Sequence, residues 1–269
     1  MIEGMTKGRS GLSVADGATL TVDVDTTISA AAATVLDDAS VAAMLITLGA
    51  IGRIVAVQVL ATGTTSGNFG AATNGCLMFK LGAGGGGGAM ATAAVSGGGA
   101  GGGGAGALLV KLILAITPGA AFTCVVGASG AGGAAGANNG TAGTASTFTY
   151  NAVTYTSPGG LGGIGGTANA ARINLLGGAS TSAATNGNVN GSGACGQPGV
   201  TTLGTANCCS GTGGSSIFGG GGNALVTQSA GNGGRGFGSG GGGACLVNGG
   251  ASVAGGDGTN GMILLIELS

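Results

Sequence analysis

The sequence predicts a mainly β and irregular fold in which apolar strands frame long, ordered glycine tracts. Glycine and proline account for 68 and 3 of the 269 residues, a share at which disorder is the usual expectation. The chain is nevertheless 43% hydrophobic and only 6% charged, whereas disordered chains are poor in apolar residues and rich in charge. The glycine tract 82–106 is also followed directly by the apolar run 107–116. A chain this apolar must pack, so we expect its glycine tracts to be ordered.

The composition changes sharply near residue 81. Residues 1–80 carry 10 of the 15 charged residues, whereas residues 82–261 carry 58 of the 68 glycines. This change predicts an N-terminal part, residues 1–80, and a glycine-rich part, residues 81–269.

The N-terminal part is expected to contain a short strand-helix-strand unit. Residues 19–25 alternate apolar and polar side chains, which is typical of a half-buried strand. In residues 36–50, Asp37 or Asp38 can cap a helix and Gly49 suits its C-terminal end. Residues 53–61 are predicted to form a second strand, with the valines at 55, 57 and 59 on one face.

The glycine-rich part contains further apolar runs that read as strands. Residues 76–81 precede the first long glycine tract, and residues 261–269 close the chain. Residues 107–127 are long enough to cross a bilayer, but Lys111 lies within them and Thr117-Pro118-Gly119 divides them. We therefore expect a core hairpin there and no membrane insertion. A short strand pair is predicted around Asn151-Ala152.

The six cysteines do not have metal-ligand spacing. There is no CxxC pair and no histidine, so we expect no metal site. Cys76 and Cys124 lie in apolar strands and are predicted to be buried free thiols. Four others, at positions 195, 208, 209 and 245, lie in loop-like sequence and could pair under oxidising conditions; their state is left open.

The residue types present argue against an enzyme. No histidine is available as a general base, and beyond residue 81 the side-chain carboxylates are only Asp257 and Glu267. No phosphate-binding loop of the GxxxxGK[ST] type occurs, and we expect no cofactor. A net charge of −1 offers no electrostatic footprint for nucleic acid. The N-terminus lacks the apolar region of a secretory signal.

Two parts of the sequence resemble proteins of tailed bacteriophages. LDDASVAAMLITLGA, residues 36–50, resembles a short segment that recurs in tail-fibre and tail-tip proteins, with the Asp-Asp pair, the small residues and Thr-Leu-Gly at the same spacing. It departs at Met44-Leu45-Ile46, where the usual segment is more polar. Residues 76–268 resemble a glycine-rich domain of phage tail-fibre adhesins in the order of their framing strands, their glycine tracts and a final apolar strand.

The resemblance implies that the glycine tracts pack side by side as polyglycine II helices. Such a helix has three residues per turn, so glycine is expected at every third position wherever a neighbour approaches. Glycines 127, 130, 133 and 136 have this spacing, as do glycines 255, 258 and 261. Ordering a glycine costs more than one hydrogen bond returns, so the flanking apolar strands must fix the ends of each tract.

The loops between the glycine tracts are the candidate binding sites. They comprise residues 147–156, 168–176, 186–199 and 215–228, and loops on a rigid scaffold often carry binding function. The candidate receptor-binding residues are Phe148, Tyr150, Asn151, Tyr155, Arg172, Asn174, Phe218 and Asn223. An alternative interpretation is that these residues only cap the glycine helices.

We therefore expect a bacteriophage virion protein, a tail-fibre tip or receptor-binding adhesin. Its N-terminal part would bind other virion proteins, and its loops would bind a host receptor, either a glycan or an outer-membrane protein. We also expect a homo-oligomer, with a trimer as one option, assembled in the host cytoplasm and exposed on the virion. The alternative is a capsid or tail decoration protein without a receptor of its own.

Overall fold

The computed structural model describes residues 5–8, 11–14, 53–92, 96–167, 174–179, 181–200 and 208–269. The chain divides into two compact units, Met1–Ala50 and Ile51–Ser269. In the first unit, β1 (Met5–Gly8) and β2 (Gly11–Val14) form an antiparallel pair that the sequence patterns did not predict. The strand expected at 19–25 and the helix expected at 36–50 lie outside the described residues. Every regular element in the described part of the chain is a β-strand.

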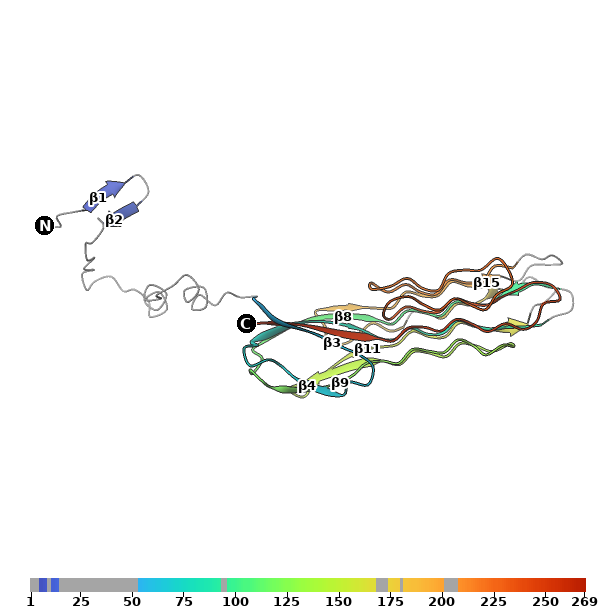
Figure 1. Cartoon of the computed structure of the whole chain (residues 1–269), viewed down its shortest axis with the longest axis horizontal. Coiled ribbons are helices and arrows are strands. Elements are labelled where there is room, and N and C mark those ends of the chain that lie inside the picture. Colours follow the sequence, from blue (N-terminus) through green and yellow to red (C-terminus); the bar gives the residue numbers. More distant parts are fainter. Residues whose placement is uncertain are drawn as a thin grey trace. The chain divides into compact units, whose positions relative to one another are not determined.

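A five-stranded antiparallel sheet forms one layer of the second unit (Figure 1). Its order is β14-β8-β5-β17-β3, so the C-terminal strand lies between two strands from residues 54–81. The composition changes at residue 81 because β5 ends there and the glycine tracts begin. The strands are β3 (Ile54–Leu60), β5 (Gly75–Leu81), β8 (Leu108–Leu114), β14 (Val189–Gly191) and β17 (Met262–Leu268).

A four-stranded antiparallel sheet forms the second layer, in the order β11-β10-β9-β4. Its strands are β4 (Ser66–Asn68), β9 (Ala121–Val125), β10 (Ser146–Tyr150) and β11 (Val153–Ser157). The strand pair predicted around Asn151-Ala152 is confirmed. Both turn residues have positive φ, 48° and 61°, as a two-residue hairpin turn of the I′ type requires.

The prediction that residues 107–127 form a hairpin is wrong, because its two strands do not pair with each other. Both strands exist, but β8 pairs with β5 and β14, whereas β9 pairs with β10 and β4 in the other sheet. The chain turns between the layers at Ala115 (φ 55°) and Gly119 (φ 74°). This crossing explains why the segment is apolar throughout, since both of its strands contribute to one core.

The core between the two sheets is a cluster of apolar and aromatic side chains. Its sixteen fully or nearly buried members come from both sheets and from the adjoining loops. Phe69, Phe122, Phe148 and Tyr155 stack in tilted or edge-on contacts, with ring centroids 4.9–6.4 Å apart. Cys76 and Cys124 are buried free thiols, as predicted, and burial raises the pKa of Cys76 to about 12.

Two charged side chains are fully buried at the edges of this core. The Lys80 ammonium donates to the Tyr155 carbonyl oxygen, and the Glu267 carboxylate accepts from Gln58, from Thr73 and from the Gly70 amide at 2.8 Å. Burial lowers the pKa of Lys80 from its ordinary 10.5 to about 7, because a low-dielectric site disfavours the charged amine.

Lys80 should make stability depend on pH. Between pH 7 and about 10 the unfolded chain binds a proton that the folded chain releases, so the free energy of unfolding should rise with pH. Between pH 7.0 and 8.5 we expect a gain of about 1–2 kcal/mol in urea denaturation. Above this window the raised pKa of Cys76 acts in the opposite direction. Lys80→Met should remove the gain, and an unchanged slope in that variant would contradict the assignment.

Beyond the two sheets, glycine-rich segments lie side by side and form what we call the glycine bundle (Figure 1). Three central segments, residues 82–90, 99–107 and 238–244, hydrogen-bond to one another. The outer segments surround them and comprise residues 127–133, 138–144, 158–166, 175–179, 191–199, 209–215, 219–224, 230–235 and 253–261.

The hydrogen bonds of a central segment repeat every three residues. The amides of Gly84, Gly85 and Gly86 donate to three different neighbours, at Thr259, Gly104 and Thr141. The amides of the next three residues, 87–89, donate to the same neighbours three residues earlier, at Gly256, Gly101 and Asn138. The carbonyl groups of this segment accept from three other segments, 130–133, 160–166 and 241–244. Residues 82–90 therefore have six hydrogen-bonded neighbours.

This spacing between segments leaves no room for a side chain at the contact positions. A Cβ on Gly103 or Gly243 would lie less than 3.0 Å from a carbonyl oxygen of another segment. Of the glycines that the three-residue spacing singled out, 127, 130, 133, 255, 258 and 261 are crowded in the same way. Gly136 is the exception, because it has a positive φ of 124° in a turn and a Cβ there would meet only the Asn138 side-chain amide at 3.0 Å. The unbroken runs 84–88, 101–104 and 240–243 belong to central segments, which have neighbours on all sides.

Substituting a crowded glycine should disrupt the bundle. A Cβ at Gly133 would overlap the Asn138 carbonyl oxygen, whereas a Cβ at Gly233 would meet only the Asp257 carbonyl oxygen at 3.6 Å. Gly133→Val should therefore cause misfolding or insolubility, while Gly233→Val should remain soluble with a melting temperature within a few degrees of the parent. Soluble yield and thermal melting test this pair. A normally folded Gly133→Val protein would contradict close packing at that position.

Candidate functional site

Two of the predicted receptor-binding residues are core residues. Phe148 has no exposed surface and Tyr155 retains 6%, because their strands β10 and β11 turn these rings toward the five-stranded sheet. The expectation that both rings lie on an exposed loop is wrong. Alternation along the strands places Thr147, Thr149 and Thr154 on the other face, so the period-two pattern of TFTYNAVTYT was the signal for burial.

Tyr150 and Asn151 lie at the end of the four-stranded sheet that points away from the bundle. The Tyr150 ring packs edge-on against Phe69, and its hydroxyl accepts from the Thr117 amide at 3.1 Å. Asn151 is exposed in the hairpin turn. Tyr150 therefore fixes the turn around Thr117, through which the chain passes from one sheet to the other.

The other predicted residues are spread over the bundle. Phe218 is 40% exposed in a turn beside the sheets and faces Phe237 across an isolated bridge. Asn223 is exposed on an outer segment. Asn174 lies in β13 (Asn174–Leu175), which pairs with β15 (Gly199–Val200), and Arg172 lies outside the described residues. The structure does not bring the described members of this set together in one site.

A different set of loops gathers at the end of the bundle away from the sheets, at the right of Figure 1. We call the described residues 90–92, 134–137, 224–230 and 246–253 the distal loops. Thr92 hydrogen-bonds to Ser252 and to the Gly250 carbonyl oxygen, Gln228 donates to the Ala251 carbonyl oxygen, and Ser229 pairs with Cys245. These contacts join three distant parts of the sequence, 90–92, 224–230 and 246–253, at one end, and residues 134–137 form the turn between two outer segments.

The distal loops rest on a second apolar cluster. Met90, Ala100, Leu175, Ala244 and Leu246 are buried together, with Val253 packed against them. Short strand pairs support it: β6 (Met90–Ala91) with β12 (Gly166–Thr167), and β7 (Gly98–Gly99) with β16 (Cys245–Leu246). The sequence patterns did not predict this cluster, although single large apolar residues at the ends of glycine tracts indicate it.

A disulfide fastens the same end of the bundle. Cys208 and Cys245, left open as partners by the sequence, are bonded across 37 residues, and Cys195 and Cys209 are exposed free thiols. The bond joins an outer segment to a central one. The distal loops are therefore held by apolar contacts, by hydrogen bonds and by a covalent link.

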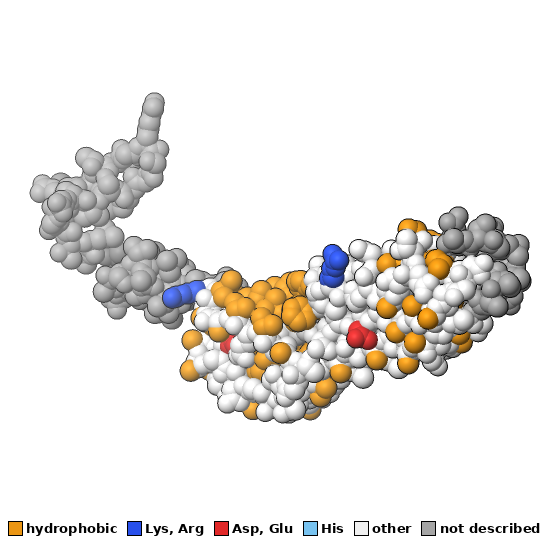
Figure 2. All heavy atoms as spheres, turned by 45° about the vertical axis from the view of Figure 1, so that its right-hand side comes forward, with side chains coloured by type: hydrophobic (Ala, Val, Ile, Leu, Met, Phe, Trp, Pro, Cys, Tyr) orange, Lys and Arg blue, Asp and Glu red, His pale blue; other side chains and the backbone are white. Residues whose placement is uncertain are grey.

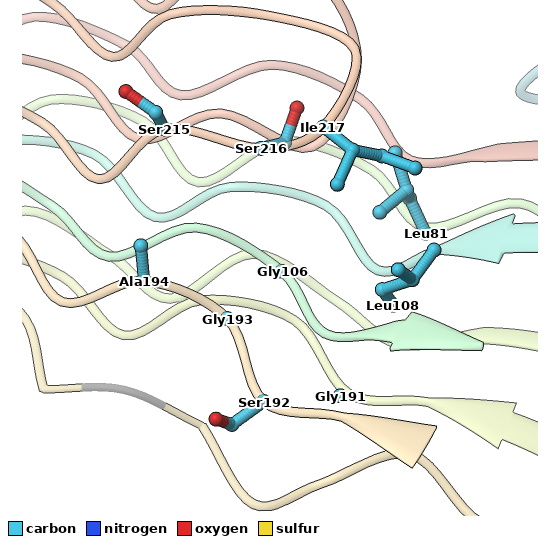
Figure 3. A pocket seen from close by; sticks show the side chains of 10 residues that line it. All are labelled: Leu81, Gly106, Leu108, Gly191, Ser192, Gly193, Ala194, Ser215, Ser216 and Ile217. Atoms are coloured by element: carbon cyan, nitrogen blue, oxygen red, sulfur yellow. The ribbon is translucent and has the colours of Figure 1, made fainter. Parts of the chain in front are cut away.

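A small hollow lies where the five-stranded sheet meets the bundle (Figure 3). It has a volume of about 400 Å³, with Leu81 and Leu108 from the sheet on one side. Residues 191–194 and 215–217 from the bundle complete it, so two of the predicted candidate loops, 186–199 and 215–228, meet here. None of the described residues that line the hollow has a titratable side chain, so these residues offer hydroxyl groups and apolar contacts.

The described surface of the bundle carries few charges (Figure 2). Among its described residues, the charged side chains are those of Arg235 and Asp257, and the Asp257 carboxylate accepts from the Gly132 amide at 2.7 Å. No group of three or more histidine, cysteine or acidic side chains that could hold a metal ion occurs in the described part of the chain. The described residues also contain no helix with the length and hydropathy needed to cross a membrane. Because Arg235 and Asp257 lie outside the distal loops, these loops offer uncharged polar and apolar side chains for contacts.

Comparison with known families identifies the glycine-rich part of the chain. A family model described as a glycine-rich domain matches residues 60–266. This match covers well over half of the chain, so the protein belongs to the glycine-rich domain family. A search of curated proteins found no match.

Proposed function

We propose that the protein is a structural component of a bacteriophage virion, a tail-fibre tip or receptor-binding adhesin that contacts the host through its distal loops. The proposal assigns the chain no catalytic activity and no cofactor. Its N-terminal part attaches the protein to other virion proteins. The resemblance of residues 36–50 and of the order of elements in residues 76–268 to tail-fibre proteins supports this assignment.

The glycine bundle is, in this proposal, a bundle of polyglycine II helices. The backbone hydrogen bonds between its segments repeat every three residues, which supports this geometry because polyglycine II has three residues per turn. Each residue then points its amide at a different neighbour, about 120° from the last. Such a bundle is stiff along its length and suits a protein that must hold a contact surface away from a particle.

The gathering of loops at one end of the bundle carries the proposal. The distal loops contain exposed polar side chains, such as Thr92, Gln228 and Asn248, and the exposed apolar side chain of Val226. Because their backbone ends are fixed by the bundle, their side chains can change without altering the fold. Neutral polar and apolar side chains suit a glycan or the loop of an outer-membrane protein.

Adding charge to the distal end should abolish host adsorption. Leu176 and Val226 are 66% and 68% exposed near the distal end, so Leu176→Asp with Val226→Asp should leave folding intact. Virions assembled with this double variant should adsorb at least about tenfold more weakly to the strain that propagates them, since a few residues usually dominate binding. Adsorption is measured beside a particle count.

The matched control places the same charges away from the distal loops. Leu161 and Val153 are 45% and 44% exposed on the side of the bundle and on the four-stranded sheet. Leu161→Asp with Val153→Asp should adsorb normally. If the distal variant assembles and also adsorbs normally, the receptor-binding role is wrong and a decoration protein without a receptor becomes the better assignment.

A further inference from the structure

The outer face of the five-stranded sheet is apolar, and its side chains stay exposed or half-buried among the residues that the structure describes. Residues directly opposite one another on neighbouring strands share a face, so the register divides this surface into rows that cross the sheet. One row consists of Val59, Leu264, Phe79, Val110 and Val189, and the next of Val57, Ile266, Leu77 and Leu112. We call these two rows, with Leu114 and Leu268 beside them, the outer apolar face.

The exposure of these side chains is unusually high for a sheet face. Val57 and Val59 are 58% and 59% exposed, and Leu112 and Leu114 are 42% and 68% exposed. The inner face of the same strands shows the contrast, since Met78, Leu109 and Leu265 are fully buried against the second layer. Figure 2 shows a contiguous group of hydrophobic side chains at the sheet end of the unit.

The outer apolar face continues onto the adjoining turns of the bundle. The hollow described above joins Leu81 and Leu108 of the sheet to Ile217, which is 57% exposed (Figure 3). Phe218 and Phe237 follow in the facing turns, at 40% and 41% exposure. The turns that contain Ile217, Phe218 and Phe237 therefore border the outer apolar face on the side of the bundle, and they are apolar as well.

We propose that the outer apolar face is a self-association surface, on which the same face of a second copy of this chain packs. The eleven apolar side chains of the face and the three residues of the adjoining turns form one continuous apolar patch of fourteen residues, against the roughly 20–30 residues on one side of a standard interface. Continuous exposed apolar patches commonly mark a surface that binds another protein chain. The face carries no charged side chain, so a charged partner would find no complement on it. An aliphatic sheet face can pack against a second copy of itself, as two sheets do in a β-sandwich.

This inference does not rest on the proposed virion role. It requires only that the face be covered in solution and that the covering group come from a second chain. The two copies would meet through equivalent residues, as a twofold axis requires. The distal loops take no part in this contact.

The first test measures the mass of the full chain in solution. Light scattering after gel filtration should give twice the 24.2 kDa chain mass. Val57→Lys with Leu112→Lys should shift the protein to monomers and raise the dimer dissociation constant at least about 100-fold, because two charges must enter an apolar interface. Val226→Lys, at the distal end and 68% exposed, is the matched control and should stay dimeric. A monomeric parent protein, or a double variant that remains dimeric, would overturn the proposal.

The second test identifies what covers the face. The photocrosslinking residue p-benzoylphenylalanine at position 57 should give a product of doubled mass, whose linked peptide lies in the five-stranded sheet of the second copy. The same residue at position 226 should give no such product. A link from position 57 to residues 1–50 of the same chain would overturn the proposal, because the face would then be covered from within. Linkage to another surface of a second copy would overturn it as well.

Discussion

The structure depends on backbone hydrogen bonds between segments that lie too close together for side chains. In a sheet each strand has at most two hydrogen-bonded neighbours, but residues 82–90 have six. That arrangement is possible only where the contact positions lack a Cβ, as at Gly103 and Gly243. The glycine content of the chain is therefore a packing requirement. It also explains why the longest glycine runs lie at the centre of the bundle, where a globular protein would place its largest apolar residues.

Such a bundle cannot order itself. Fixing each residue costs roughly 1–2 kcal/mol, more for glycine, and a backbone hydrogen bond returns only about 0.5–1.5 kcal/mol. The remaining free energy of ordering must come from side-chain packing at the two ends of the bundle. At one end the two sheets bury an aromatic and aliphatic core, and at the other Met90, Leu175 and Leu246 form a smaller one. The Cys208–Cys245 bond closes a loop of 37 residues there, which contributes about 4 kcal/mol in the chain-entropy model.

The sequence predicted the strands and the inward-facing glycines because both have short-range signals. Alternating valines predicted β3, apolar runs predicted β5 and β17, the expected strand pair around Asn151-Ala152 predicted β10 and β11, and the spacing of three predicted the crowded positions at Gly127, Gly130 and Gly133. It did not predict which strands pair, since β8 and β9 separate into different sheets through a turn whose sequence would also suit a hairpin. The candidate site was only partly predictable for the same reason. The alternation around Phe148 carried a signal for burial that the assignment to a binding loop overlooked, whereas the distal loops come from segments that only the tertiary fold brings together.

Hydrogen–deuterium exchange of the central segments tests the account most directly. Every amide in residues 84–88, 101–104 and 240–243 donates to another segment, so these amides should exchange only when the whole unit unfolds. Their protection should equal that of the amides in β17 at the centre of the five-stranded sheet. Exchange of the glycine amides within seconds, while β17 remains protected, would show that the glycine tracts are not hydrogen-bonded and would contradict the account.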